Sequence, residues 1–377
     1  MTVRATARGA ERTSLEGVRG DVLICGASFA GLAAARELAG AGADVLVVDR
    51  YEIGERQTSA CAIPTPWIDA LGLGASARQE LPQMTFTTPH GSVAYRLPWS
   101  WTAFDYRELC LALWAQCGSA RFVTAKVDGC TEDEAGDVVV RTDRGALRAP
   151  LVVDALGWRR VLADPHYQPP DAPLSRGLEV HPDREPAGDA LDIWVERGVA
   201  RRGYGWRVPA GEEARIGVAS YDPRRTVKNA TVALAERLDA TPERFQGNWF
   251  PHRLRPAADE RVFFAGDSAG HCYPLSGEGI RPALYFGSAC GREIRGVLEG
   301  RQTRRAALQR YAAFSHDHRG GFAVARALQR VIPALPPRVL TGVLRVIGRQ
   351  ALVDRAFSWY LGLTPLSSIS PSTADTS

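Results

Sequence analysis

Several features that mark other classes of protein are missing from this sequence. No stretch reaches the roughly 18 apolar residues that a membrane-spanning helix needs. The polar leader, residues 1–19, contains arginines but no apolar core, which excludes a secretory signal. No basic run is interleaved with aromatic residues, and the net charge of +4 is modest, so we expect no nucleic-acid partner. The sequence predicts a soluble cytoplasmic protein, peripheral to a membrane at most.

Cysteine patterns typical of metal or disulfide sites are also missing. The seven cysteines are odd in number and show no C-x-x-C or His/Cys metal spacing, which predicts no metal site and a reducing compartment. Lysine is nearly absent, since Lys126 and Lys228 are the only two. What is present is ordinary: 377 residues, 45% hydrophobic and 23% charged, which indicates a globular enzyme of two interleaved domains.

The first element after the leader is a strand–turn–helix–strand unit. Residues 21–25 predict a buried strand, 29–38 a helix and 44–49 a second strand, which together form a parallel βαβ unit. We expect this unit to open an α/β domain.

The turn of this unit has the residues of a dinucleotide site. Gly26 permits a tight turn and Gly31 lets helix and strand approach, while Ser28 replaces the usual middle glycine and Ala30 is also small. A pyrophosphate would lie at the helix N-terminus, where free N–H groups favour negative charge. Asp49 ends the second strand, where an acidic side chain can bind ribose hydroxyls. A glycine turn without a nucleotide is the alternative, and this context disfavours it.

A second segment, residues 261–280, decides which dinucleotide is expected. A buried strand brings Asp267 to the sheet edge, where its carboxylate can accept a hydrogen bond from a ribityl hydroxyl. Pro274, Gly277 and Gly279 shape a loop that opens the next helix, which is expected from about Gly277 and includes Ile280, with N–H groups facing the flavin pyrimidine. An enzyme that binds only nicotinamide has no use for this element, so the sequence predicts FAD.

The remaining patterns predict an α/β fold in which a Rossmann-type FAD-binding domain is interleaved with a mostly antiparallel β substrate domain, followed by C-terminal helices. A short antiparallel excursion is expected over residues 86–101. We assign 20–85, 104–164 and 258–300 to the FAD-binding domain, 86–103 and 165–257 to the substrate domain, 301–364 to the helices, and 1–19 and 365–377 to disordered ends.

The chain resembles the FAD-dependent oxidoreductases of the p-hydroxybenzoate hydroxylase structural class, and within it the geranylgeranyl reductase family. The resemblance covers most of residues 21–300 and fades in the tail. It rests on the glycine turn with Asp49, on the G-D-x-A-G-…-P-…-G-E-G-I pattern of 266–280, and on two further segments. The helix over 104–113 is similar to one whose arginine reaches the flavin, which implies this role for Arg107. We also place Arg50 and Val127 at the cofactor.

The fourth segment, Y-G-W-R-V-P at residues 204–209, resembles a strand motif that lines the reductases' substrate cavity beside the flavin. Tyr204 and Trp206 have the same strand phase, so both point to one face, as substrate wall or as ordinary core. Trp99 and Trp101 either close the pocket or form a hairpin aromatic pair.

The catalytic group stays open in the sequence. Cys61, all that remains of the reductases' Cys-Gly-Gly run, is a candidate proton donor or an inert buried thiol, and Tyr273 is another candidate beside Tyr204 and Trp206. His271 could contact flavin or substrate or make a structural hydrogen bond. Glu278 near a helix N-terminus is favourable without any catalytic role.

The resemblance implies an ene-reductase that saturates double bonds of an apolar isoprenoid or polyene, with electrons from NAD(P)H or a separate reductase. An aromatic monooxygenase is the alternative, although Asp154-Ala-Leu-Gly replaces the D-G pair of those enzymes. A halogenase would need an early lysine, and none precedes Lys126. A flavin-dependent binding or sensor protein is the non-enzyme alternative.

The tail adds one expectation about partners. If residues 338–351 form a helix, Arg338, Arg345 and Arg349 lie on one face and apolar residues including Val343 on the other. Such a helix either contacts an anionic membrane surface or packs on its own domain. The oligomeric state is not indicated.

Overall fold

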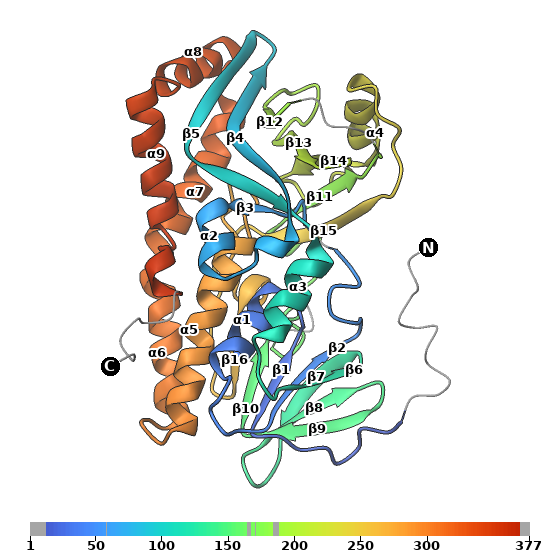
Figure 1. Ribbon diagram of the computed structural model, residues 1–377, viewed down its shortest axis with the longest axis vertical. Coiled ribbons are helices and arrows are strands. Elements are labelled where there is room, and N and C mark those ends of the chain that lie inside the picture. The colour runs from blue at the N-terminus through green and yellow to red at the C-terminus, as the bar shows by residue number, and fades with distance from the viewer. Residues whose placement is uncertain (1–12, 58, 164–166, 170, 184–187, 370–377) are drawn as a thin grey trace.

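The computed structural model describes residues 13–57, 59–163, 167–169, 171–183 and 188–369. Three sheets and a long sheath of C-terminal helices build the molecule (Figure 1). The sheets have five, eight and three strands, in the orders β16-β10-β1-β2-β6, β15-β11-β14-β13-β12-β4-β5-β3 and β7-β8-β9.

The five-stranded sheet is the parallel core of the expected dinucleotide domain. Its strands are short, and four of the five are fully buried except at Asp49, as strands covered on both faces are, whereas the edge strand at residues 121–124 is only partly buried. They are β1 (Val22–Cys25), β2 (Val45–Asp49), β6 (Arg121–Thr124), β10 (Leu151–Asp154) and β16 (Val262–Phe264), and all pair in parallel.

Helix α1 (Phe29–Glu37) packs against this sheet, and α3 (Tyr106–Ala115) and α5 (Ile280–Leu298) pack against α1. Glycine allows α5 to approach α1 closely, since a Cβ at Gly287 would lie 2.4 Å from the Ala30 carbonyl oxygen. Helix α5 begins later than the sequence pattern indicated because Gly277, with φ +66°, lies in a turn and not in the helix.

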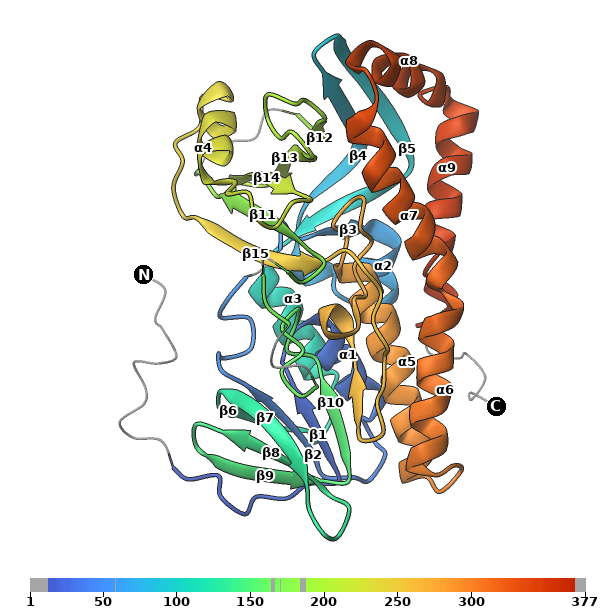
Figure 2. The same cartoon turned by 180° about the vertical axis from the view of Figure 1, so that it is seen from behind.

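A three-stranded antiparallel sheet lies below the parallel one (Figures 1 and 2). Its strands are β7 (Val127–Glu132), β8 (Val138–Thr142) and β9 (Gly145–Ala149). The described part of the leader, residues 13–19, is placed along it: Leu15 is buried and donates its N–H to the Arg144 carbonyl at 2.7 Å. The prediction of a disordered leader is therefore wrong for these residues, because Leu15 has a buried apolar contact, and residues 1–12 lie outside the described range.

The eight-stranded sheet forms the second body of the fold and is antiparallel except between β12 and β4. Its strands are β3 (Ala62–Pro64), β4 (Ala77–Thr88), β5 (Gly91–Phe104), β11 (Leu174–Val180), β12 (Ala190–Trp194), β13 (Gly203–Ala210), β14 (Glu213–Ser220) and β15 (Gln246–Pro251). The prediction of a short excursion over 86–101 is wrong, because this segment belongs to the long β4–β5 hairpin. The first strand of the hairpin begins at Ala77, in a polar stretch without the apolar alternation that would have predicted a strand.

Helices complete the fold. They are α2 (Thr65–Ala70), α4 (Lys228–Arg237), α6 (Arg304–Asp317), α7 (Arg319–Val331), α8 (Pro337–Ile347) and α9 (Gln350–Gly362), with 3-10 turns η2 (Gly74–Ser76), η3 (Gly266–Ala269), η4 (Ile332–Ala334) and η5 (Leu366–Ser368). Helices α8 and α9 pack on the β4–β5 hairpin along one long edge of the molecule (Figures 1 and 2). No helix within the described residues combines the length and the apolar character needed to cross a membrane.

Two sequence expectations for the C-terminal region need correction. The helix expected over 338–351 is two helices, because the chain turns at Gly348 and Arg349. The ordered chain also reaches further than predicted, since Ile369 is buried in the main core. Residues 370–377 lie outside the described range.

Candidate active site

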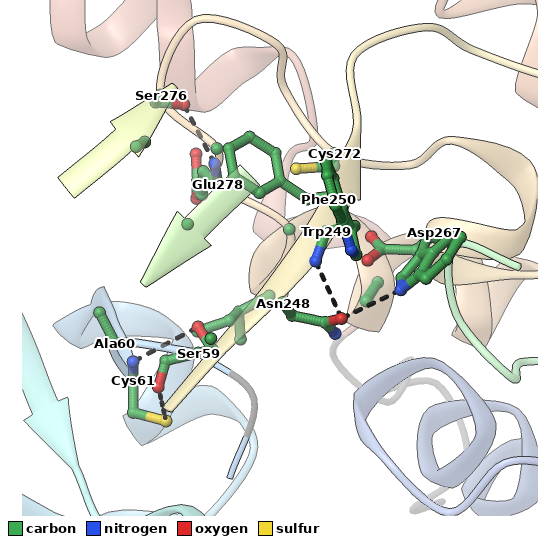
Figure 3. Close-up of a pocket in the computed structure, with 18 of the residues that line it drawn as sticks. Ser59, Ala60, Cys61, Asn248, Trp249, Phe250, Asp267, Cys272, Ser276 and Glu278 are labelled. Atoms are coloured by element: carbon green, nitrogen blue, oxygen red, sulfur yellow. Dashed lines mark hydrogen bonds between the residues drawn. The ribbon is translucent and has the colours of Figure 1, made fainter. Parts of the chain in front are cut away.

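One large cavity lies between the parallel sheet, the eight-stranded sheet and the C-terminal helices. Its volume is about 1020 Å³, at the upper end of the roughly 300–1,000 Å³ range of small-molecule sites. Segments far apart in the chain meet around it, among them the loop at Cys61, strand β15 and the loop after Asp267 (Figure 3).

The N-terminus of α1 forms one end of this cavity. Ser28 and Ala30 line it, and Ser28 as N-cap leaves the first-turn N–H groups without a side-chain acceptor. Gly26 has φ +113°, and a Cβ there would lie 2.3 Å from the Ala155 carbonyl oxygen, so only glycine fits. Gly31 is buried behind the turn, where a Cβ would lie 1.9 Å from the Gly26 carbonyl oxygen. The turn therefore presents free donors to an anionic group.

Asp49 lies beside this turn at the end of β2. Its Oδ2 accepts the Ala27 N–H at 2.9 Å and its Oδ1 accepts the Tyr51 N–H at 3.0 Å, which holds the carboxylate at the cavity wall. Burial raises its pKa, while these N–H groups and the Arg50 charge oppose the rise. Arg50 and Val127 also line the cavity.

Asp267, in η3, lines another part of the cavity. Burial raises its pKa to about 7, against the opposing charge of Arg255. Gly277, Gly279 and Ile280 line the cavity beside it, whereas Pro274 does not. A buried carboxylate of this kind is suited to accept hydrogen bonds from ligand hydroxyls.

These features fit FAD. The helix terminus can bind the pyrophosphate, and the Asp49 and Asp267 carboxylates can bind ribose and ribityl hydroxyls along one continuous cavity.

The eight-stranded sheet gives the cavity an aromatic wall. Tyr204 and Trp206 both line it, with ring centroids 5.8 Å apart, which confirms that they share a face. The indole of Trp206 lies over Gly217, where a Cβ would be 2.2 Å from its Cζ2, and its Nε1 donates to Glu179 Oε2 at 3.2 Å. The phenol of Tyr204 donates to the Ser276 carbonyl. The glycine at 217 thus lets Trp206 lie flat on the sheet.

Cys61 lies in the cavity wall with a strained backbone. Its φ is +55°, a left-handed conformation that is uncommon for a residue with a Cβ. The buried Arg215 guanidinium donates to the carbonyls of Ala60 and Cys61 at 2.9 and 3.1 Å and holds this conformation. The thiol donates to the Ser59 carbonyl at 3.0 Å (Figure 3), and burial raises its pKa well above the usual value.

Comparison with known proteins shows what the chain is similar to. The family model described as "FAD binding domain" matches residues 19–83. Digeranylgeranylglycerophospholipid reductase 1 of Methanothermobacter thermautotrophicus is 25% identical over 325 residues, which are 76% of this chain and 79% of that protein. A geranylgeranyl bacteriochlorophyll reductase-like protein from Thermoplasma acidophilum superposes with a TM-score of 0.80 at 16% identity, covering 93% of this chain and 95% of that one.

The chain is an FAD-dependent oxidoreductase that is similar to geranylgeranyl reductases. The flavin-dependent brominase Bmp2 has the same fold, with a TM-score of 0.66 at 16% identity over 91% of this chain and 99% of that one. The architecture therefore serves several flavin chemistries, and the reaction of this oxidoreductase has to be argued from its site.

Some predicted residues of the oxidoreductase lie away from the cavity. Arg107 is exposed on the first turn of α3 and does not line the cavity, although its backbone packs against Gly54, which does. A flavin contact for Arg107 stays a prediction. Trp101 is buried and lines the cavity, but Trp99 does not, because β5 bulges between the residues that pair with Leu81 and Gln83.

Tyr273 and His271, two further candidates, have contacts that indicate structural roles. Tyr273 lies outside the lining and packs against Phe322 and Tyr360, with centroids 4.8 and 5.5 Å away. His271 is fully buried, stacks on Phe286 at 3.8 Å and bonds Ser315 at 2.9 Å, so the structural interpretation holds for it.

Glu278 lines the cavity and pairs with a buried arginine. Its Oε1 lies 2.7 Å from Nε of Arg281, whose guanidinium also donates to the Leu361 carbonyl at 2.9 Å and to the Thr364 hydroxyl at 2.7 Å. This pair fastens the end of α9 to the start of α5. Its geometry supports a structural role.

The sequence did not reveal a group of lining residues on β15 and the C-terminal helices. Asn248 accepts hydrogen bonds from Trp158 Nε1 at 3.0 Å and from the backbone N–H of Trp249 at 2.9 Å (Figure 3), and the first of these orients the Trp158 indole at the wall. The other missed residues include Phe250, Leu340, Leu344, Phe357 and Tyr360. Only the aromatic content of Asn-Trp-Phe in an otherwise polar stretch offered a signal for β15.

Proposed function

We propose that this oxidoreductase saturates carbon–carbon double bonds of an isoprenoid or polyene-like apolar substrate. The observation that carries the proposal is the two-part character of the cavity. Its cofactor end holds Asp49 and the α1 N-terminus, and it continues without interruption to a wall of apolar and aromatic side chains. This wall includes Met84, Phe86, Leu191, Ile193, Trp206, Val208, Leu344 and Phe357. The relative from Methanothermobacter carries the name of a reductase of an isoprenoid lipid, which supports the same substrate class.

The wall determines how a substrate would lie. Burial of an extended hydrocarbon against it gains about 25 cal/mol per Å² of apolar surface removed from water. The flat indole of Trp206 and the ring of Tyr204 present faces on which a planar alkene can pack. Binding energy from the chain's length would thus position one double bond at the cofactor end.

When bound and reduced, FAD supplies a hydride to one carbon of that double bond. The second carbon needs a proton, and Cys61 and Tyr204 are our candidate donors among the protonated side chains that line the cavity. The Cys61 thiol and the Tyr204 phenol both have pKa values raised by burial, so both keep their protons at neutral pH. Tyr204 donates to the Ser276 carbonyl at rest, and this bond would orient its hydroxyl. NAD(P)H or a separate reductase is the proposed electron source.

The test is anaerobic. The flavoprotein is reduced, a geranylgeranyl lipid is added, and the return of flavin absorbance is recorded. The mass of the product is then measured. Reoxidation with gain of two hydrogen atoms per double bond is the expected result. If reoxidation occurs only after oxygen is admitted, with substrate-dependent oxygen uptake, the monooxygenase alternative replaces this proposal.

A pair of matched variants tests the phenol. Tyr204→Phe removes a cavity hydroxyl that donates to Ser276, while Tyr221→Phe removes a neighbouring cavity hydroxyl that donates to the Leu275 carbonyl at 2.7 Å. If Tyr204 delivers the proton, only its variant loses rate, by about 10²–10⁴-fold. Equal effects of the two substitutions would rule out Tyr204 as the specific proton donor.

A further inference from the structure

The outer surface of α7, α8 and α9 is unusually apolar. Ten large hydrophobic side chains are exposed among the described residues, and eight of them lie on these three helices. We name these eight the outer C-terminal face; they are Val324, Leu328, Val331, Val339, Val343, Val346, Leu352 and Trp359. On α7 and α8 they recur at i, i+4 and i+7, which makes a continuous stripe on each helix.

The apolar face that the sequence predicts for α8 is divided between the surface and the interior. Val343 is 41% exposed, with Val339 and Val346 near half exposure. Leu340 and Leu344 instead face inward and line the cavity. Helix α8 therefore has apolar side chains both toward the cavity and toward the surface, and its arginines are exposed.

The same helices carry a concentrated net positive charge. Residues 319–362 contain seven arginines and a single acidic residue, Asp354, which gives +6 in a chain whose total is +4. Arg330, Arg338, Arg345, Arg349 and Arg355 are exposed, and none of them forms an ion pair with a carboxylate of the described residues.

The positive charges of α7 shift the pKa values of neighbouring side chains. His252 is partly buried nearby, and this burial together with the charges of Arg326, Arg330 and Arg202 lowers its pKa to about 4. Arg326 itself has a lowered pKa, from burial and from the Arg330 and Arg253 charges. Clustered arginines that repel one another are stabilised by a negatively charged partner.

We infer that the outer C-terminal face docks on an anionic lipid bilayer. The apolar stripes would enter the headgroup boundary and the arginines would contact lipid phosphates, with Trp359 at the interface. A second copy of this chain fits poorly, because a two-fold interface would place two such +6 segments against each other. Since Leu340, Leu344 and Phe357 of these helices line the cavity, docking also brings the cavity wall next to the lipid.

The docking inference rests on the proposed function for its biological meaning, but membrane binding is measured without any catalytic assay. The holoprotein is mixed with vesicles of phosphatidylcholine, with or without phosphatidylglycerol, and bound protein is separated by flotation. No substrate is present, so a failed reductase assay and a failed vesicle assay are independent results. We expect binding to the phosphatidylglycerol vesicles that weakens as salt is raised.

Two variants and a control make the test specific. Arg338→Gln/Arg345→Gln/Arg349→Gln is expected to weaken binding about fivefold for each charge removed. Val343→Asp/Val346→Asp is expected to weaken it by about tenfold per valine.

The control carries the same change of charge at the opposite end of the molecule, on the parallel and three-stranded sheets: Arg121→Gln/Arg141→Gln/Arg148→Gln. It should bind as the wild type does. Equal binding to both kinds of vesicle, or equal loss in the control, would overturn the inference. A dimer in solution that Val343→Asp/Val346→Asp dissociates would also overturn it, in favour of self-association.

Discussion

A methyl group added at Gly217 should disturb the cavity wall more than one added at Gly177, although both glycines lie beneath the same indole. At Gly217 the new Cβ would be 2.2 Å from Cζ2 and 2.5 Å from Cε2 of Trp206. At Gly177, on the neighbouring strand, the nearest atoms are 3.6 Å away on Trp206 and Phe250, an ordinary contact. The two substitutions therefore add the same group to the same face with different clearance.

The cost of Gly217→Ala follows from that clearance. Carbon atoms pack at about 3.5–4.0 Å, so the indole has to move by more than about 1 Å. Overpacking of this kind costs about 1–3 kcal/mol. The movement also breaks the 3.2 Å bond from Trp206 to Glu179, and a bond to a charged group contributes about 1.5–3 kcal/mol. We expect a loss of roughly 2–4 kcal/mol, against less than about 0.5 kcal/mol for Gly177→Ala.

Guanidinium unfolding of the two FAD-saturated variants, followed by circular dichroism, measures this difference. The same proteins should differ in KM for an apolar substrate, because the displaced indole narrows the cavity. Equal stabilities of Gly217→Ala and Gly177→Ala would refute the placement of Trp206 on the sheet.

Three other predictions follow from the cofactor end and the wall. Asp49→Ala should weaken FAD retention by about 10–100-fold, since it removes the carboxylate placed for the ribose; fluorescence titration of the apoprotein measures this. The pKa of Asp267 is raised to about 7, so the native state binds its proton more tightly than the unfolded chain does. The stability of the apoprotein should therefore fall as pH rises from about 4 to 7 and stay low above that. Melting temperatures measured against pH should show this slope for the wild type and not for Asp267→Asn. The Cys61 thiol should resist iodoacetamide at pH 8 in the native protein and react after unfolding, and rapid native labelling would contradict its burial.

Local patterns predicted the cofactor end of this protein well. The βαβ unit with its glycine turn is contained in about thirty residues, and the backbone needs of Gly26 and Asp49 are set by neighbours in sequence. The strand phase of Tyr204 and Trp206 is equally local, and the structure confirms it.

Features that depend on distant contacts could not be predicted in this way. Trp99 and Trp101 have the same alternation in sequence, and only the bulge against β4 separates them. Val343 and Leu344 look alike on a helical projection, and which of them faces the cavity depends on how α8 packs on the β4–β5 hairpin. The inward orientation of Asn248 likewise depends on its pairing with β11.

The two ends of the cavity differ in how well they tolerate substitutions. The cofactor end is built by parallel strands whose register links residues near positions 22, 151 and 262, so a substitution there affects the whole sheet. The far wall comes from α8 and α9, near the end of the chain, which rest on the hairpin through side chains. Mutations at Leu344 or Phe357 can lengthen or shorten the chamber while the redox end stays intact. We therefore expect substitutions in α8 and α9 to change which substrates fit while FAD binding is kept. A mutant library aimed at new substrates should vary these two helices.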